Sequence, residues 1–231
     1  MSHHSGRSDS GPKAKLVWIG RGCNNNCSTC PFPDERFNQE LDEIQNRRKN
    51  EVQLVFVGRE PAIHPDFIDY VKAANLSGYN IIEVVTNGRI FSSPRFAKRA
   101  VHAGLTDVLI KLSSSNSKIH DSITGVDGSW NQTINGMRNL LKLSKSGHPF
   151  LRPSVVVGIY LCEKNIKTLD NTIEFLKSEG VKEIFIINAG VDKSALGNIT
   201  DKCIMTLGFD SDRDYKEFAK KNKVISHSET P

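Results

Sequence analysis

Six short runs of apolar, mostly β-branched residues recur along the chain, and longer stretches with helical spacing lie between them. The runs do not alternate strictly between apolar and polar residues. This pattern is typical of strands that are buried on both faces of a parallel sheet. We therefore predict six parallel strands, at residues 15–20, 52–58, 81–86, 107–112, 153–161 and 183–188.

Four of the intervening stretches place apolar residues on one helical face and end at a glycine. In one of them Phe67, Val71 and Ala74 share a face, and Gly78 follows. Glycine just after the last apolar position is a common helix end. Alternating strands and helices are typical of βα units wound around a parallel sheet, so we expect an α/β fold with outer helices. The four predicted helical stretches are 65–78, 93–104, 131–147 and 169–180.

The βα pattern spans residues 15–190, which we expect to form one domain. Residues 1–14 are small, polar and rich in Gly and Ser, which predicts a disordered tail. Residues 191–231 have no firm period, apart from a predicted surface helix at 212–223. We expect this last part to be an extension that packs on the domain or closes it.

Composition and charge exclude some classes of protein. The formal net charge is +5, and the densest basic run, 46–50, lies among acids, which favours a solvated amphipathic helix over a nucleic-acid surface. No apolar run approaches the roughly 20 residues that a membrane span needs. The first 15 residues do not contain the apolar segment of a signal peptide, and five cysteines are an odd number, so we expect a reducing, cytoplasmic location.

A polar or glycine-containing group follows each apolar run directly. In a parallel βα fold, binding sites lie at the carboxyl ends of the strands. These groups should therefore surround one mouth and form a single shared site. In chain order they read "RGCNNNCSTC", "GREPAIHPD", "TNGR", "SSSNSKIHD", "CEKN" and "NAG".

The first group carries three cysteines, Cys23, Cys27 and Cys30, within eight positions. Thiolates favour soft metals and iron–sulfur clusters. A zinc site remains possible if His64 or a distant cysteine supplies a fourth ligand. Three metal-free core cysteines are disfavoured, because Gly and Asn flank them as in a loop. Three thiolates can also hold three irons of a [4Fe–4S] cluster and leave the fourth iron open.

These residues resemble the radical S-adenosylmethionine (SAM) superfamily. The spacing CxxxCxxC follows the first predicted strand, as the cluster motif does there, and "GREP" at 58–61 is similar to the family's "GGEP". "TNG" at 86–88 matches its third-strand ending, and residues 120–141 resemble the loop and helix after strand four in peptide- and cofactor-modifying members. The resemblance covers residues 15 to about 190 and implies a partial (β/α)6 barrel.

The resemblance also implies the chemistry. Cys23, Cys27 and Cys30 would hold a [4Fe–4S] cluster, and SAM would chelate the open iron. One electron, from a donor such as flavodoxin or ferredoxin, would yield a 5′-deoxyadenosyl radical that abstracts hydrogen from a peptide or small metabolite. The alternatives are a non-catalytic iron–sulfur or zinc module that binds a partner or transfers electrons, and a degenerate member without turnover.

The resemblance gives roles to residues around the cysteine loop. Glu60 would hold the SAM amino group, and Gly58 would allow close backbone approach. Arg59, in place of a second glycine, would face solvent or the SAM carboxylate. Lys111 would pair with that carboxylate or a ribose hydroxyl, or reach solvent. The remaining predicted cofactor contacts are Thr86, Asn87, which is alternatively only a turn residue, and the hydroxyls of Ser113 and Ser115.

Weaker candidates complete the prediction. Asn165 would meet the ribose, and residues 187–190 would line the adenine edge. We expect structural or capping roles for His64, His120 and Asp121, and a core position for Cys162. Thr29 stands where many members have an aromatic residue, for which Phe32 or Trp18 would substitute. Cys203 alone after residue 190 cannot build an auxiliary cluster, so we predict a single one.

Overall fold

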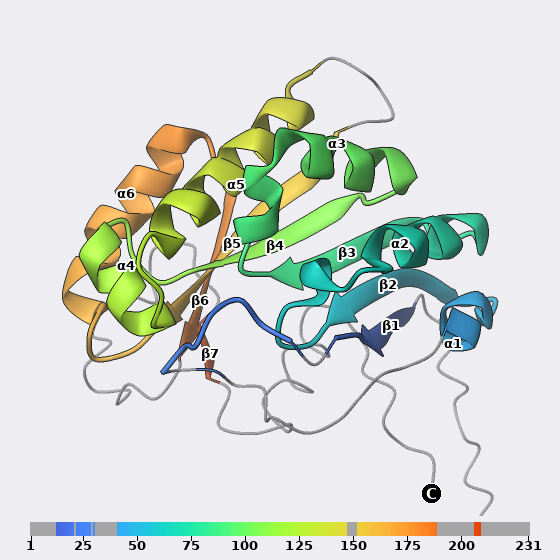
Figure 1. The fold of residues 1–231 in the computed structure, drawn as a ribbon, viewed down its shortest axis with the longest axis horizontal. Coiled ribbons are helices and arrows are strands. Elements are labelled where there is room, and N and C mark those ends of the chain that lie inside the picture. The colour runs from blue at the N-terminus through green and yellow to red at the C-terminus, as the bar shows by residue number, and fades with distance from the viewer. Residues whose placement is uncertain are drawn as a thin grey trace, which may run out of the picture.

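The computed structural model describes residues 13–20, 22–28, 30, 41–146, 152–188 and 206–208 of the 231-residue chain. Within these ranges one seven-stranded sheet follows the chain order, and every neighbouring pair is parallel (Figure 1). Its strands are β1 (Lys13–Trp18), β2 (Glu51–Val57), β3 (Ile81–Thr86), β4 (Asp107–Leu112), β5 (Ser154–Leu161), β6 (Glu183–Asn188) and β7 (Thr206–Gly208).

All six predicted strands are present, and three of them have the predicted bounds. Strand β1 begins at Lys13, two residues inside the predicted tail, and residues 1–12 lie outside the described ranges. Strand β7 was not predicted, because three residues are too few to form a recognisable apolar run. It pairs with β6, where Ile187 is opposite Leu207, so this piece of the extension adds to the sheet.

The described helices lie along one side of the curved sheet (Figure 1). The four predicted helices correspond to α2, α3, α5 and α6, and short 3-10 turns follow β2, β3 and β5. No described helix is long and apolar enough to cross a membrane. The helices are α1 (Leu41–Gln45), α2 (Phe67–Leu76), α3 (Pro94–Ala103), α4 (Ser117–Thr124), α5 (Ser129–Ser144) and α6 (Leu169–Glu179), and the turns are η1 (Pro61–Ile63), η2 (Arg89–Ser92) and η3 (Ile166–Thr168).

Two local predictions were wrong. The basic run 46–50 is not helical, because α1 ends at Gln45. The Glu51 carboxylate accepts the backbone N–H of Arg48 at 2.9 Å and holds the chain in the turn that leads into β2. The start of the stretch 120–141, expected to be a loop before a helix, is already helical, because His120 lies in α4 (Ser117–Thr124). The predicted helix at 212–223 and the helix-ending Gly147 lie outside the described residues.

Helix α4 has its own start and stop signals. The Asn116 side chain accepts the N–H of Ile119 at 3.2 Å, as an N-cap does. Gly125 ends the helix in the left-handed conformation, with φ at 67°. With eight residues, the helix is too short to show the apolar periodicity on which the other helix predictions relied.

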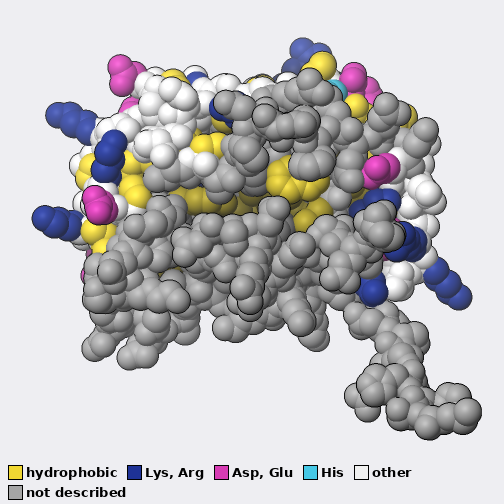
Figure 2. All heavy atoms as spheres, turned by 90° about the horizontal axis from the view of Figure 1, so that it is seen from below, with side chains coloured by type: hydrophobic (Ala, Val, Ile, Leu, Met, Phe, Trp, Pro, Cys, Tyr) yellow, Lys and Arg dark blue, Asp and Glu magenta, His cyan; other side chains and the backbone are white. Residues whose placement is uncertain are grey.

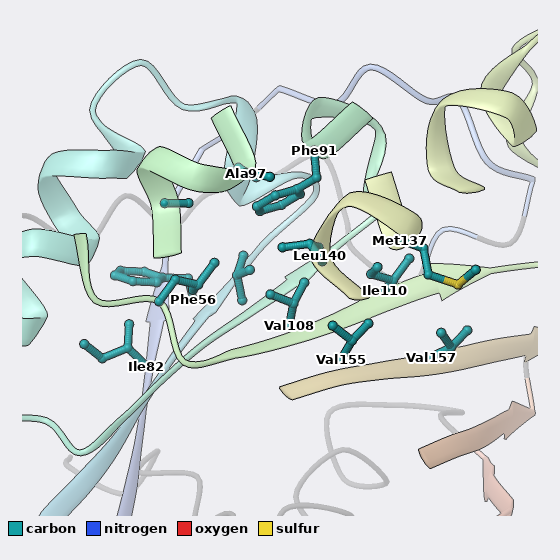
Figure 3. Packing of buried hydrophobic residues seen from close by; sticks show 14 of the residues in the cluster. Phe56, Ile82, Phe91, Ala97, Val108, Ile110, Met137, Leu140, Val155 and Val157 are labelled. Carbon is teal, nitrogen blue, oxygen red and sulfur yellow. The ribbon is translucent and has the colours of Figure 1, made fainter. Parts of the chain in front are cut away.

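The hydrophobic core lies between the sheet and its helices (Figure 3). Phe56, Val108 and Val155 project from β2, β4 and β5 toward the helices. Phe91 and Leu140 meet them from η2 and α5. Side chains alternate across a strand, so the neighbours of these residues point to the other face. That face carries hydrophobic side chains along its middle, in the view from below (Figure 2).

Candidate active site

A pocket opens at the carboxyl ends of the central strands. This is the edge of the sheet where the sequence predicted one shared site. The cavity is lined by Cys23, Asn25, Cys27, Cys30, Arg59, Asn87, Lys111, Ser113, Thr124 and Tyr160.

The cysteine loop is attached to the last turn of α4 by backbone hydrogen bonds. The N–H of Asn26 donates to the carbonyl of Thr124 at 2.8 Å, and the N–H of Ser28 donates to Ile123 at 2.9 Å. Gly125 permits this contact, since a Cβ there would lie 2.7 Å from the Asn26 carbonyl oxygen. The loop residues therefore reach the cavity wall with their backbone already bonded to a helix.

The thiols lie in a polar setting that suits metal-bound sulfur. The Sγ of Cys23 accepts the N–H of Asn25 at 3.3 Å, with the Asn87 Nδ2 at 3.9 Å. Burial raises the pKa of Cys27, and the Lys111 ammonium opposes this rise. The charges of Cys23 and Cys30 also raise that pKa, which places all three thiols within electrostatic reach of one another.

The geometry argues against a single zinc ion. Among the residues that the structure describes, no three Cys, His, Asp or Glu side chains converge as ligands of one metal ion. A tetrahedral zinc needs every ligand about 2.0–2.3 Å from one point, whereas a cluster offers each cysteine a separate iron. His64, the suggested fourth zinc ligand, stacks on Tyr70 and accepts the N–H of Asp66 through Nδ1. Three closely spaced thiols are a donor set that can hold three irons of a [4Fe–4S] cluster.

Glu60 is fully buried behind the cavity wall, between the ends of β2 and β3. Its Oε1 accepts the Thr86 hydroxyl at 2.5 Å and the N–H of Ala62 at 3.3 Å, and its Oε2 accepts the N–H of Asn87 at 2.6 Å. Burial raises the pKa of Glu60, while Lys111 and these three donors oppose the rise. A carboxylate has about four acceptor positions, so one remains for a further donor.

At Gly58 the backbone lies close to another part of the protein, the backbone of Ile19. Gly58 has a φ of 142°, and a Cβ there would lie 2.6 Å from the carbonyl oxygen of Ile19. Arg59 and Lys111 do line the cavity, and the Lys111 Nζ lies 3.4 Å from the Arg59 carbonyl oxygen. The cavity wall thus carries two cationic side chains.

The remaining predicted contacts divide between the cavity and the fold. Asn87 and Ser113 line the cavity, whereas Thr86 is fully buried and committed to Glu60. Ser115 does not line it, and its N–H donates to Thr172 at 3.0 Å. Asn165, suggested for the ribose, does not line the cavity, and its side chain bonds to the backbone of Ser113, Tyr160 and Cys162.

His120 and Asp121 have the structural roles that we expected. The Nδ1 of His120 accepts the N–H of Ser113 at 3.2 Å, and burial lowers the pKa of this histidine to about 4. The Asp121 carboxylate accepts the N–H groups of Gly128 and Trp130, both at 2.8 Å, at the start of α5. Neither side chain lines the cavity.

Other candidates lie elsewhere or outside the described ranges. Cys162 is a buried free thiol at the end of β5, as expected of a core position. Trp18 lies in β1 and does not line the cavity. Thr29, Phe32, Cys203 and residues 189–190 are outside the described residues.

Sequence reasoning missed several residues at the site. Tyr160 projects from β5 into the cavity, and Thr124 reaches it from the end of α4. The alternation along β5 signals the inward direction of Tyr160, but its distance from the cysteine loop depends on the curvature of the sheet. Arg89, directly after "TNG", bonds to Asn24 and Asn25 of the cysteine loop.

A family model described as "Radical SAM superfamily" matches residues 18–176. The chain belongs to this superfamily. Its cofactors are therefore a [4Fe–4S] cluster and S-adenosylmethionine, and the members of this superfamily are enzymes that share one general mechanism.

Curated relatives match most of the chain. It is 28% identical over 179 residues to a "Probable GTP 3',8-cyclase" of Sulfurisphaera tokodaii, covering 74% of this chain and 54% of that protein. It is 24% identical over 177 residues to an "AdoMet-dependent heme synthase" of Methanosarcina barkeri, covering 71% and 47%. The chain thus spans about half the length of these relatives.

Solved structures support the same fold. Streptococcus suis SuiB bound to S-adenosylmethionine superposes with a TM-score of 0.64 at 11% identity, covering 91% of this chain and 53% of SuiB. A structure titled anSMEcpe with bound AdoMet and a Cp18Cys peptide gives a TM-score of 0.62 at 15% identity, covering 92% and 59%. The partial barrel of the radical SAM type that the resemblance implied is confirmed.

Proposed function

We propose that this radical SAM enzyme abstracts hydrogen from a peptide or a small metabolite. The observation that carries the proposal is the shared cavity, in which three cysteines lie beside Arg59, Lys111 and Ser113. Two relatives are named as a GTP cyclase and a heme synthase, and one similar solved structure contains a bound peptide, so both substrate classes have support. Because the chain spans about half of its relatives, the substrate of the whole protein is part of this proposal.

Cys23, Cys27 and Cys30 hold the cluster in this proposal, and the open iron takes SAM. When bound, the two cofactors supply a 5′-deoxyadenosyl radical after one-electron cleavage of a carbon–sulfur bond of SAM. The remaining acceptor position of the Glu60 carboxylate suits the SAM ammonium. Lys111 and Arg59 offer positive charge to the carboxylate of SAM, and Ser113 offers a hydroxyl to the ribose of SAM.

The residues around the cavity also limit side reactions. Tyr160 is 9% exposed and Asn25 is 8% exposed, so these two side chains of the cavity wall are shielded from solvent. Such shielding matters because a free radical is quenched by solvent or by stray thiols. We further propose a flavodoxin or ferredoxin as the physiological electron donor and a cytoplasmic location.

The test is anaerobic reconstitution with iron and sulfide, followed by dithionite and SAM. The proposal expects 5′-deoxyadenosine and methionine as products. Deuterium-labelled peptides and metabolites then identify the substrate, because the substrate transfers its label to 5′-deoxyadenosine. An electron-transfer or binding module would leave SAM intact, and a protein with one zinc and no iron or sulfide would contradict the proposal.

A further inference from the structure

Arg89 joins three parts of the structure next to the cysteine loop. It lies directly after β3, at the start of η2, and is half-buried. Its Nη1 donates to the carbonyl of Asn24 and, at 2.7 Å, to the Oδ1 of Asn25. Its Nε donates to the Oε1 of Gln132 on α5 at 2.7 Å. The guanidinium is a rigid planar fork, so these bonds hold the loop at a defined distance from α5.

Asn25, whose side chain Arg89 binds, contacts Cys23 through its backbone. The backbone N–H of Asn25 donates to the Cys23 Sγ at 3.3 Å. Asn87 donates to the Oδ1 of Asn24 at 2.6 Å, and its Oδ1 accepts the N–H of Arg89 at 3.0 Å. Arg89 therefore binds the carbonyl of the same peptide group whose N–H, that of Asn25, points at this sulfur.

We propose that Arg89 is a positioning residue for the cluster, acting through Asn24 and Asn25 on Cys23. This inference rests on the proposed function, since it assigns the cluster to the three cysteines. Hydrogen bonds to cysteine sulfur help to set the reduction potential of an iron–sulfur cluster. Partners that orient metal ligands typically change metal affinity or activity 10- to 100-fold when they are mutated.

The loop has a second, independent attachment, and this makes the inference testable. On its other side, Asn26 and Ser28 donate to the last turn of α4. Loss of Arg89 should therefore free the Cys23 end of the loop and leave the Cys27 end attached. Unfolding of the whole loop would instead affect both ends equally.

The experiment compares Arg89→Met and Arg89→Lys with Arg138→Met in the full chain. Arg138 also forms a two-bond fork, to Glu179 at 2.8 and 2.6 Å, but joins α5 to α6 away from the cysteine loop. The first readout is amide hydrogen exchange of residues 22–28 before reconstitution. We expect faster exchange at Asn24 and Asn25 in Arg89→Met, little change at Asn26 and Ser28, and no change in Arg138→Met.

The second readout uses the reconstituted protein. Arg89→Met should release iron to a chelator about tenfold faster than wild type, and its reduction potential, followed by electron paramagnetic resonance, should be lower. Arg89→Lys keeps the charge but not the fork, so it should recover only part of both changes. If Arg89→Met is poorly folded, Gln132→Leu, which removes only the α5 anchor, should shift both readouts in the same direction.

The outcomes separate the two proposals. If wild type binds no cluster on the three cysteines, the proposed function and this inference both fail. If wild type binds the cluster and Arg89→Met keeps its exchange, iron-release rate and potential, only this inference fails. Equal changes in Arg89→Met and Arg138→Met, or full recovery by Arg89→Lys, would likewise contradict positioning by the guanidinium fork.

Discussion

Glu83 and Asp107 lie directly opposite each other on the neighbouring strands β3 and β4. Their chain neighbours Val84 and Val108 pack in the core, so the two carboxyl groups leave the sheet on the face away from the helices. Gln53 donates to the Glu83 carboxylate at 2.8 Å. Burial, and then the charge of Asp107, raise the pKa of Glu83 to about 7.

This pair predicts a pH-dependent stability. A carboxyl group whose pKa is higher in the folded protein favours folding below its unfolded pKa, and this contribution is lost as the pH rises toward 7. Glu83→Gln should weaken the dependence, because burial also raises the pKa of Asp107, which still titrates. The variant should be more stable than wild type at pH 8 by about 1 to 3 kcal/mol. Urea unfolding between pH 5 and pH 8 measures this, and parallel curves for the two proteins would contradict it.

Gly125 should matter to the cysteine loop more than an ordinary helix-ending glycine. Gly125→Ala combines a φ of 67° with a Cβ 2.7 Å from the Asn26 carbonyl oxygen. Gly128 is the matched control, because its φ is 75° but nothing lies within 4 Å of its Cβ position. The left-handed conformation alone costs about 1–2 kcal/mol in either variant.

We therefore expect Gly125→Ala to be destabilised more than Gly128→Ala and to reconstitute with less iron. Thermal unfolding and iron analysis of the two variants side by side measure the difference. Equal losses in both variants would mean that the contact with Asn26 has no separate effect.

Substitution of the three loop cysteines should affect the cluster differently from substitution of the buried Cys162. Alanine at Cys23, Cys27 or Cys30 should abolish the cluster, since each would leave a second iron without a protein ligand. Cys162→Ala should keep a full complement of iron and sulfide, although it loses some core packing. Iron and sulfide analysis after anaerobic reconstitution measures this. Loss of the cluster in Cys162→Ala would identify Cys162 as a fourth protein ligand of the cluster.

Glu60 should affect SAM binding more than its hydrogen-bond partner Thr86 does. In wild type, both carboxylate oxygens of Glu60 accept hydrogen bonds from buried donors. In Glu60→Gln an amide N–H replaces one of these oxygens and faces such a donor, so a buried group is left unpaired at a cost of about 1–3 kcal/mol. The substitution also removes the negative charge proposed to meet the SAM ammonium. We expect SAM affinity to fall by more than tenfold in Glu60→Gln, and by less in Thr86→Val, which keeps the charge. Calorimetric titration of the reconstituted variants measures both, and equal affinities would assign Glu60 a purely structural role.

The elements that could be predicted are those whose signal is local. The strands at 81–86, 107–112 and 183–188 have the predicted bounds, because a run of β-branched residues is long enough to show burial on both faces. The three closely spaced cysteines were recognised for a similar reason, since their ligand chemistry depends on residue type and short spacing alone. Helix α4 and strand β7 were missed because short segments show no clear period.

The positions of side chains at the cavity depend on contacts between distant parts of the chain. Glu60 bonds to residues 26 and 27 positions away, and Arg89 bonds to a loop more than 60 positions before it. Parallel strands bring such segments together only after the crossover helices have packed, and no local pattern encodes the resulting distances. Chain order and residue chemistry thus led to the family and its cofactors, whereas tertiary packing decided that Lys111 and Tyr160 face the cavity while Thr86 and Asn165 stabilise its walls.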